Sequence, residues 1–170
     1  MKFTVYDDSG ILSIINIDKY ISFVADDATA QDILLHATQE MNNQHAILWQ
    51  ACKHPDKKIC IEFRNSATDL IPFDEILHTI EVTDEKLYIV NFTDLAMVAQ
   101  FDDIILPCLD RKDWSINLPN GLYELNIRKM FDEEDEWNDD INTHYEIIIN
   151  PAESGYRILS NGIYWYKNED

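Results

Sequence analysis

Residues 114–140, WSINLPNGLYELNIRKMFDEEDEWNDD, predict two strands joined by a tight turn and followed by an acidic connection. Apolar residues occupy alternate positions on both sides of Pro119, Asn120 and Gly121, and this period of two is typical of half-buried strands. Pro, Asn and Gly favour turns, so we expect the two strands to pair as a hairpin. Its apolar face would consist of Trp114, Ile116, Leu118, Tyr123, Leu125 and Ile127.

The expected hairpin leads into seven carboxylates within the nine residues 132–140. They are Asp132, Glu133, Glu134, Asp135, Glu136, Asp139 and Asp140, and Trp137 lies among them. Proteins often carry function on a chemically distinctive loop that a rigid scaffold holds in place, and Trp is enriched among the residues that dominate interfaces. We therefore predict that these eight residues bind a basic partner. The competing interpretation is a solvated connection that only keeps the protein soluble.

Outward from this stretch, short segments rich in apolar residues recur about every ten residues, which favours an antiparallel β-sandwich or open barrel. The expected strands are 2–6, 11–17, 19–24, 46–52, 59–64, 76–82, 87–92, 145–149, 157–160 and 163–166. We predict hairpins between the first two strands, between 76–82 and 87–92, and across Asn161 and Gly162, which tolerate positive φ. Residues 65–74 are expected to form a polar loop.

One segment has the period of a helix instead. Between residues 28 and 41, apolar residues recur at i, i+3 and i+4, with Asp27 or Thr29 as the N-cap and Asn42 and Asn43 at the end. Residues 93–103 fit either a helical turn or an irregular strand. We expect a mainly β (β-rich α+β) fold with one principal helix, in a single domain that spans residues 1–170.

Charge restricts the class of partner. Thirteen basic against thirty-two acidic residues give a formal charge of −19, which disfavours nucleic acid and anionic membranes and favours basic proteins. No stretch approaches the ~20 apolar residues of a membrane span, and no secretory signal is recognisable. Cys52, Cys60 and Cys108 show no CxxC spacing and are expected to be reduced thiols, so we predict a cytoplasmic protein.

No motif of catalytic or cofactor chemistry is present in the sequence. Four isolated glycines cannot form a phosphate-binding loop. Cys52, His54 and Cys60 lack the second ligand pair of a zinc site, and Trp137 stands where a calcium loop requires glycine. We predict no cofactor, no dedicated metal site and no enzymatic activity. Two alternatives stay open: a carboxylate-dependent hydrolase, and a subunit of a larger assembly that exposes Tyr164 and Tyr166.

The order of segments from residue 28 to residue 152 resembles the bacterial competence-nuclease inhibitors of the ComJ type. In that family an LPxGxYxL hairpin precedes an acidic or polar connection and a final isoleucine-rich strand. The matching residues here are Leu118, Pro119, Gly121, Tyr123, Leu125, Ile147 and Ile148. The resemblance implies a small acidic protein that binds and blocks a DNA-degrading enzyme, and an immunity protein against a different toxin fits equally. Under either interpretation, the expected partner is a basic nuclease or toxin bound stoichiometrically.

Overall fold

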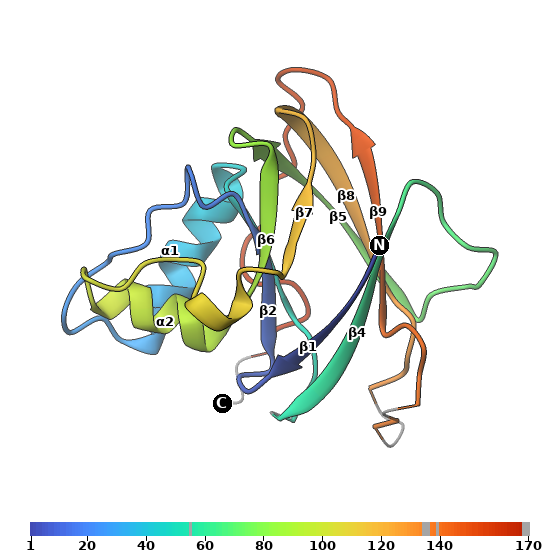
Figure 1. Cartoon of the computed structure of the whole chain (residues 1–170), viewed down its shortest axis with the longest axis horizontal. Helices are drawn as coiled ribbons and strands as arrows, with labels where there is room; N and C mark the ends of the chain where they lie inside the picture. Colours follow the sequence, from blue (N-terminus) through green and yellow to red (C-terminus); the bar gives the residue numbers. More distant parts are fainter. Residues whose placement is uncertain (55, 134–136, 139, 168–170) are drawn as a thin grey trace.

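The chain forms two β-sheets that pack face to face, with two helices on the outer face of one sheet (Figure 1). The computed structural model describes residues 1–54, 56–133, 137–138 and 140–167. The first sheet has the order β1-β4-β9-β8-β5 and the second has the order β3-β2-β6-β7. The strands are β1 Lys2–Asp7, β2 Ile11–Ile15, β3 Ala46–Gln50, β4 Lys57–Arg64, β5 Asp74–Val82, β6 Lys86–Asn91, β7 Ser115–Asn117, β8 Gly121–Lys129 and β9 Tyr145–Pro151. The mainly β fold predicted from the sequence is confirmed.

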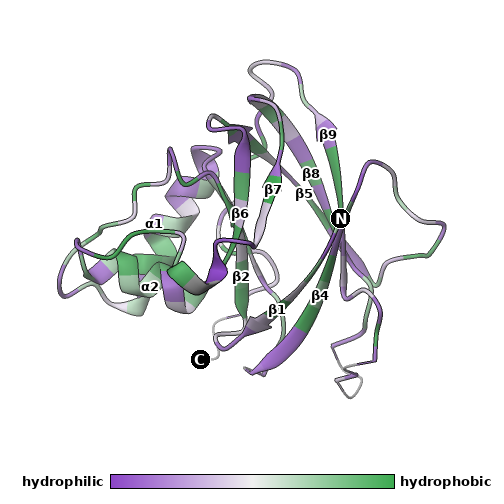
Figure 2. Cartoon of the chain, viewed as in Figure 1, coloured by the Kyte–Doolittle hydropathy of each residue, from purple (hydrophilic) through white to green (hydrophobic). Residues whose placement is uncertain are grey.

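Neighbouring strands are antiparallel except for β4 and β9, which run parallel. The core between the sheets contains the fully buried Trp49 and Tyr145. A second apolar layer separates the β3-β2-β6-β7 sheet from the helices. All five residues of β2 are buried because this strand has an apolar layer on each face. Figure 2 shows the resulting concentration of hydrophobic residues in the helices and in the strands next to them.

Helix α1, Ala30–Asn42, lies where the sequence predicts it. Thr29 forms a capping box with Asp32, because the Thr29 side chain accepts from the Asp32 backbone N–H and the Asp32 carboxylate accepts from that of Thr29. The ambiguous segment contains a second helix, α2, Phe92–Gln100. The Asn91 side chain caps it by accepting from Asp94 N at 3.0 Å. A short 3₁₀ helix, Leu109–Arg111, precedes β7.

The predicted hairpins are wrong, because their turns cross from one sheet to the other. β1 pairs with β4, β5 pairs with β8, and β7 pairs with β6. The turn after β1 places Gly10 at φ +77°, where an added Cβ would lie 2.9 Å from the Cys52 carbonyl oxygen. At the opposite crossing, Asn120 Oδ1 accepts from Glu85 N at 2.7 Å. The β5–β6 and β7–β8 connections are therefore hydrogen-bonded to each other at that end of the sandwich.

Three predicted strands, 19–24, 157–160 and 163–166, are absent from the described part of the chain. Residues 19–24 have no strand structure, and Val24 and Ala25 donate to the Ala99 carbonyl at 2.9 and 3.1 Å. Residues 157–166 form no hairpin; Tyr164 makes an isolated parallel bridge to Trp49 at the edge of β3. In both segments, backbone groups form hydrogen bonds with a neighbouring element instead of with a partner strand of a hairpin. Among the described residues, no helix combines the length and apolar character that crossing a membrane would require.

Candidate functional site

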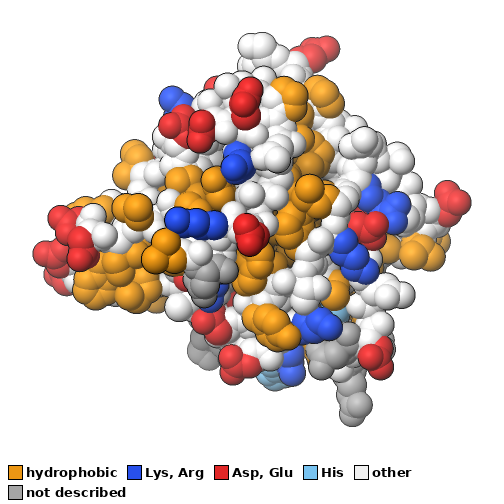
Figure 3. All heavy atoms as spheres, in the orientation of Figure 1, with side chains coloured by type: hydrophobic (Ala, Val, Ile, Leu, Met, Phe, Trp, Pro, Cys, Tyr) orange, Lys and Arg blue, Asp and Glu red, His pale blue; other side chains and the backbone are white. Residues whose placement is uncertain are grey.

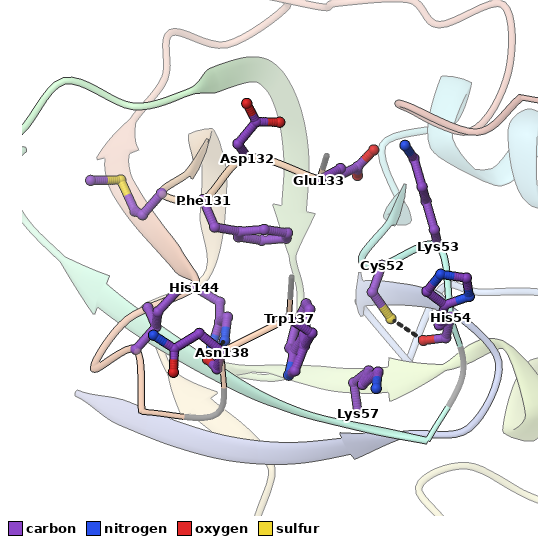
Figure 4. A pocket seen from close by; sticks show the side chains of 12 residues that line it. Cys52, Lys53, His54, Lys57, Phe131, Asp132, Glu133, Trp137, Asn138 and His144 are labelled. Atoms are coloured by element: carbon purple, nitrogen blue, oxygen red, sulfur yellow. Dashed lines mark hydrogen bonds between the residues drawn. The ribbon is translucent and has the colours of Figure 1, made fainter. Parts of the chain in front are cut away.

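The connection from β8 to β9, residues 130–144, lies beside a cavity of about 910 Å³. Figure 4 shows Phe131 and Trp137 on one side of it, and Cys52, Lys53, His54 and Lys57 on the other. The full lining is Cys52, Lys53, His54, Lys57, Met130, Phe131, Asp132, Glu133, Trp137, Asn138, Ile141 and His144. The predicted acidic segment thus borders a cavity that no pattern in the sequence predicts.

A buried ion pair fixes the beginning of this connection. The Lys129 side chain is 3% exposed, and its Nζ lies 2.6 Å from Glu133 Oε1. The same Nζ lies 4.1 Å from the centre of the Trp165 ring. Burial of an ammonium is costly, and the carboxylate and the aromatic face together offset that cost. Glu133 is therefore turned toward the protein, where its charge neutralises Lys129.

Aromatic contacts hold Trp137, further along the connection, against the body of the protein. The Trp137 ring stacks on His144 with a centroid separation of 4.6 Å and an interplanar angle of 4°, and Phe131 meets Trp137 edge-on at 5.3 Å. His144 is fully buried, and its Nδ1 accepts from Cys60 N at 3.0 Å. Nε2 must then carry the proton, which it donates to the Asn138 carbonyl at 3.2 Å. Trp137 is half-buried and contributes to the packing of this region.

Buried ionisable groups lie behind the cavity wall. Burial raises the pKa of Asp7, against the opposing effect of hydrogen bonds from Ser9. Burial and the Asp7 charge raise the pKa of Cys52 to about 12, and its Sγ donates to the His54 carbonyl at 2.9 Å. Burial likewise raises the pKa of Tyr145, whose hydroxyl donates to the Ala51 carbonyl at 2.7 Å. The Cys52 thiol is therefore protonated at neutral pH and a poor nucleophile.

The structure describes four of the eight residues predicted to bind a partner. Asp132 and Trp137 are half-buried at the cavity, Glu133 is paired with Lys129, and Asp140 is exposed. The others, Glu134, Asp135, Glu136 and Asp139, lie outside the described residues. The assignment of a binding role to this segment stays a prediction.

The basic wall of the cavity was missed by the sequence reasoning. Lys53, His54 and Lys57 come from the connection between β3 and β4 and from the start of β4. The signal that could have found them is composition, since Lys53, Lys57 and Lys58 lie within six residues of a chain that has only thirteen basic residues. No three His, Cys, Asp or Glu side chains among the described residues are grouped so as to hold a metal ion.

The C-terminal aromatic residues do not form an exposed face. Tyr164 is half-buried, and its hydroxyl lies 3.0 Å from Nδ1 of the buried His78. Trp165 is also half-buried and stacks against Tyr145 at 6.2 Å. Tyr166 is 36% exposed. Most of this aromatic group therefore closes the core.

Neither a protein-family model nor a curated protein matches the sequence. Comparison of structures finds two similar proteins. One, described as crocagin biosynthetic gene J, has a TM-score of 0.55 and 12% sequence identity, over 90% of this chain and 96% of that chain. The other is ComJ from Bacillus subtilis, described as an inhibitor of the DNA-degrading activity of NucA; its TM-score is 0.48 and its identity is 14%, over 89% and 96% of the two chains. ComJ, whose family the sequence resembles, is thus a structural neighbour. At these identities the likeness concerns the fold, and no residue's role carries over.

Proposed function

We propose that this protein is a stoichiometric inhibitor, of the immunity-protein kind, that binds a basic nuclease or toxin through a surface that includes residues 132–140. The observation that carries the proposal is the charge of −19 together with seven carboxylates in nine residues. Such a charge increases the rate of encounter with a basic protein through long-range attraction. The sequence resemblance to competence-nuclease inhibitors supplies the class of partner.

The way the connection is held supports a binding role. Its two ends are joined, since Met130 N donates to the His144 carbonyl at 2.9 Å, and Trp137 is stacked on His144. Residues held in this way, such as Met130 and Trp137, lose less conformational entropy on binding than free residues do. Its carboxylates would occupy the groove in which a nuclease binds the phosphates of its substrate, and would thereby exclude nucleic acid.

The ion pair of Glu133 with Lys129 reduces the number of carboxylates that can attract a basic partner. Glu133 neutralises Lys129, so its charge adds little to the field that a partner meets. Asp132, Glu134, Asp135 and Glu136 are the residues of the segment to neutralise first. This choice leaves the ion pair of Glu133 with Lys129 intact.

Co-expression with the product of the adjacent gene, followed by isolation of a 1:1 complex, tests the proposal. Recovery of a basic, toxic protein silenced in that complex would support it, and a neighbour that is neither bound nor inhibited would contradict it. In the purified pair, conversion of Asp132, Glu134, Asp135 and Glu136 to amides should slow association roughly tenfold at low salt. The matched control converts the exposed Glu81, Asp84, Glu85 and Glu153 in the same way. An equal effect of both variants would assign binding to net charge and would exclude the segment.

A further inference from the structure

The loop between β4 and β5, residues 65–73, has an exposed apolar tip. Leu70 is 66% exposed, Ile71 91% and Phe73 57%. Single exposed apolar residues are common, but a contiguous group marks an interaction surface. In Figure 3 this loop forms the right-hand edge of the molecule, where hydrophobic and acidic side chains lie together. The polar loop expected from the sequence therefore carries its hydrophobic residues outward.

Buried charges hold this loop in place. The Arg128 guanidinium donates to the Leu70 carbonyl at 2.6 Å and to the Thr68 carbonyl at 3.4 Å. The Glu146 carboxylate accepts from Thr68 N at 3.0 Å and from its hydroxyl at 3.2 Å. Arg128 and Glu146 are 6% and 2% exposed and form an ion pair with each other. Phe73 N donates to the Lys129 carbonyl at 2.8 Å, which fixes the end of the loop.

A buried ion pair is an expensive way to stabilise a fold, because desolvation of both charges offsets much of their attraction. Glu146 also lies 3.2 Å from Arg64, and Arg128 lies 3.7 Å from Glu75. The other hydrogen bonds of Arg128 and Glu146 go to Thr68 and Leu70 of the loop. The pair thus determines the conformation of residues 68–70. An apolar tip held in one conformation is preorganised for binding.

A groove of about 370 Å³ lies next to the tip. Its lining is Glu62, Arg64, Thr68, Leu70, Ile71, Met130, Ile141, Asn142, Thr143 and Glu146. Met130 and Ile141 also line the larger cavity. The groove and the cavity therefore both border the connection from β8 to β9.

Charge decides which occupant fits the groove. The apolar tip is bracketed in sequence by Asp69 on one side and by Asp74 and Glu75 on the other, and all three are exposed. A second copy of this chain would bring another charge of −19 against them, which is unfavourable. We propose that the groove and the tip of loop 65–73 bind a polypeptide segment of a partner that combines apolar residues with Lys or Arg. Its apolar side chains would contact Leu70 and Ile71, and its cations would face Asp69 and Asp74. Arg64, which lines the groove, is paired with Glu62 and Glu146, and Glu75 lies 3.7 Å from Arg128.

This inference deepens the proposed function and rests on it in one respect, namely that the partner is basic. The two remain separable in experiment. Neutralisation of Asp132, Glu134, Asp135 and Glu136 changes the connection, whereas a substitution of Ile71 changes only the tip. A partner that needs the carboxylates and tolerates a charge at residue 71 would overturn the groove proposal alone.

The direct test selects random peptides displayed on phage against the full-length protein and titrates the best synthetic peptide. We expect the selected peptides to combine Lys or Arg with apolar residues. Ile71→Asp should weaken binding roughly tenfold or more, although it adds a negative charge that by itself would favour a basic peptide. The matched control is Ile105→Asp, which makes the same change at a residue 77% exposed elsewhere, and it should leave the affinity unchanged.

Thermal unfolding of both variants should match that of the wild type, because both substitutions lie at exposed positions, where side-chain changes have little effect on stability. Three results with the peptides or with Ile71→Asp would overturn the proposal, and a fourth comes from the control. The first three are the absence of enriched peptides, enrichment of peptides that lack basic residues, and equal affinity for the wild type and Ile71→Asp. Loss of binding in Ile105→Asp would place the docking site near residue 105 instead, and would equally overturn it.

Discussion

The groove and the cavity, which both border the connection from β8 to β9, differ in whether the buried charges near them are paired. On the groove side, Arg128 and Glu146 neutralise each other and hold a loop. On the cavity side, Asp7 is fully buried, and among the described residues no cation lies within ion-pairing distance of its carboxylate. Buried charge therefore has two different effects within this one protein. The Arg128–Glu146 ion pair fixes the conformation of a loop at neutral pH. The unpaired Asp7 carboxylate makes the free energy of unfolding depend on pH.

The largest expected effect comes from breaking the matched pair. Arg128→Met leaves the Glu146 carboxylate with the more exposed Arg64 as its cationic partner, and we expect a loss of about 3 kcal/mol in the free energy of unfolding. The double substitution Arg128→Met with Glu146→Leu removes both charges and should recover most of that loss. Urea unfolding of the two variants measures the difference.

The double variant also separates the stability of the protein from the conformation of loop 65–73, because it should be stable and yet lose the fixed loop. Its affinity for a peptide selected on the wild-type protein should fall. If the single and the double variant are equally unstable, or if the double variant binds the peptide normally, the pair is not what positions the loop.

A smaller effect is expected for the aromatic residue on the cavity side. Trp137→Ala removes the stack on His144 and the contact with Phe131, so we expect a loss of about 2 kcal/mol. The contrast is Ile71→Ala on the groove side, which should change stability by less than ~0.5 kcal/mol. Thermal unfolding of both variants checks the pair. If Trp137→Ala is as stable as the wild type, Trp137 has no part in holding the connection.

The sequence predicted what depends on neighbours along the chain. The alternation in β8 and β9 and the period of α1 follow from local geometry, and these elements form where the pattern predicts them. Strand pairing was predicted wrongly because the turns at Gly10, Glu85 and Asn120 cross between sheets. Whether a turn closes a hairpin or leads to the other sheet depends on the core on both sides, which a local pattern does not record.

The candidate site was predictable in its charge and unpredictable in its contacts. The run of carboxylates is visible in the sequence, but the stack of Trp137 on His144 requires the connection to fold back on itself. The exposed tip of loop 65–73 runs against the general tendency of Leu, Ile and Phe to be buried. Contacts with β8 and β9, which lie far along the chain, hold the tip outward. Arg128 and Glu146 bind Leu70 and Thr68, and Phe73 N donates to the Lys129 carbonyl.

The unmatched carboxylate gives a prediction about pH. Burial raises the pKa of Asp7 above its value in the unfolded chain, about 3.9. The folded state therefore keeps a proton that the unfolded state has released, and the wild type loses stability as the pH rises from the unfolded pKa through the folded one. Asp7→Asn cannot ionise, so its stability relative to the wild type should increase over that window and stay constant above it. Urea unfolding of both proteins at a series of pH values tests this, and a difference independent of pH would contradict it.

The last prediction concerns the rate at which Cys52 is alkylated. It tests whether the cavity and the groove are independent of each other. With a pKa of about 12 against an ordinary value of 9.0, its thiolate fraction at a given pH is about a thousandfold smaller than that of a free thiol. Alkylation by iodoacetamide, followed for each cysteine by mass spectrometry, should therefore be far slower for Cys52 in the folded protein than in denaturant. Asp7→Asn removes a charge that raises this pKa, so it should accelerate the reaction. The same variant should bind the selected peptide with unchanged affinity, because Asp7 does not line the groove. A change in both properties would mean that the cavity and the groove are coupled through the connection between them.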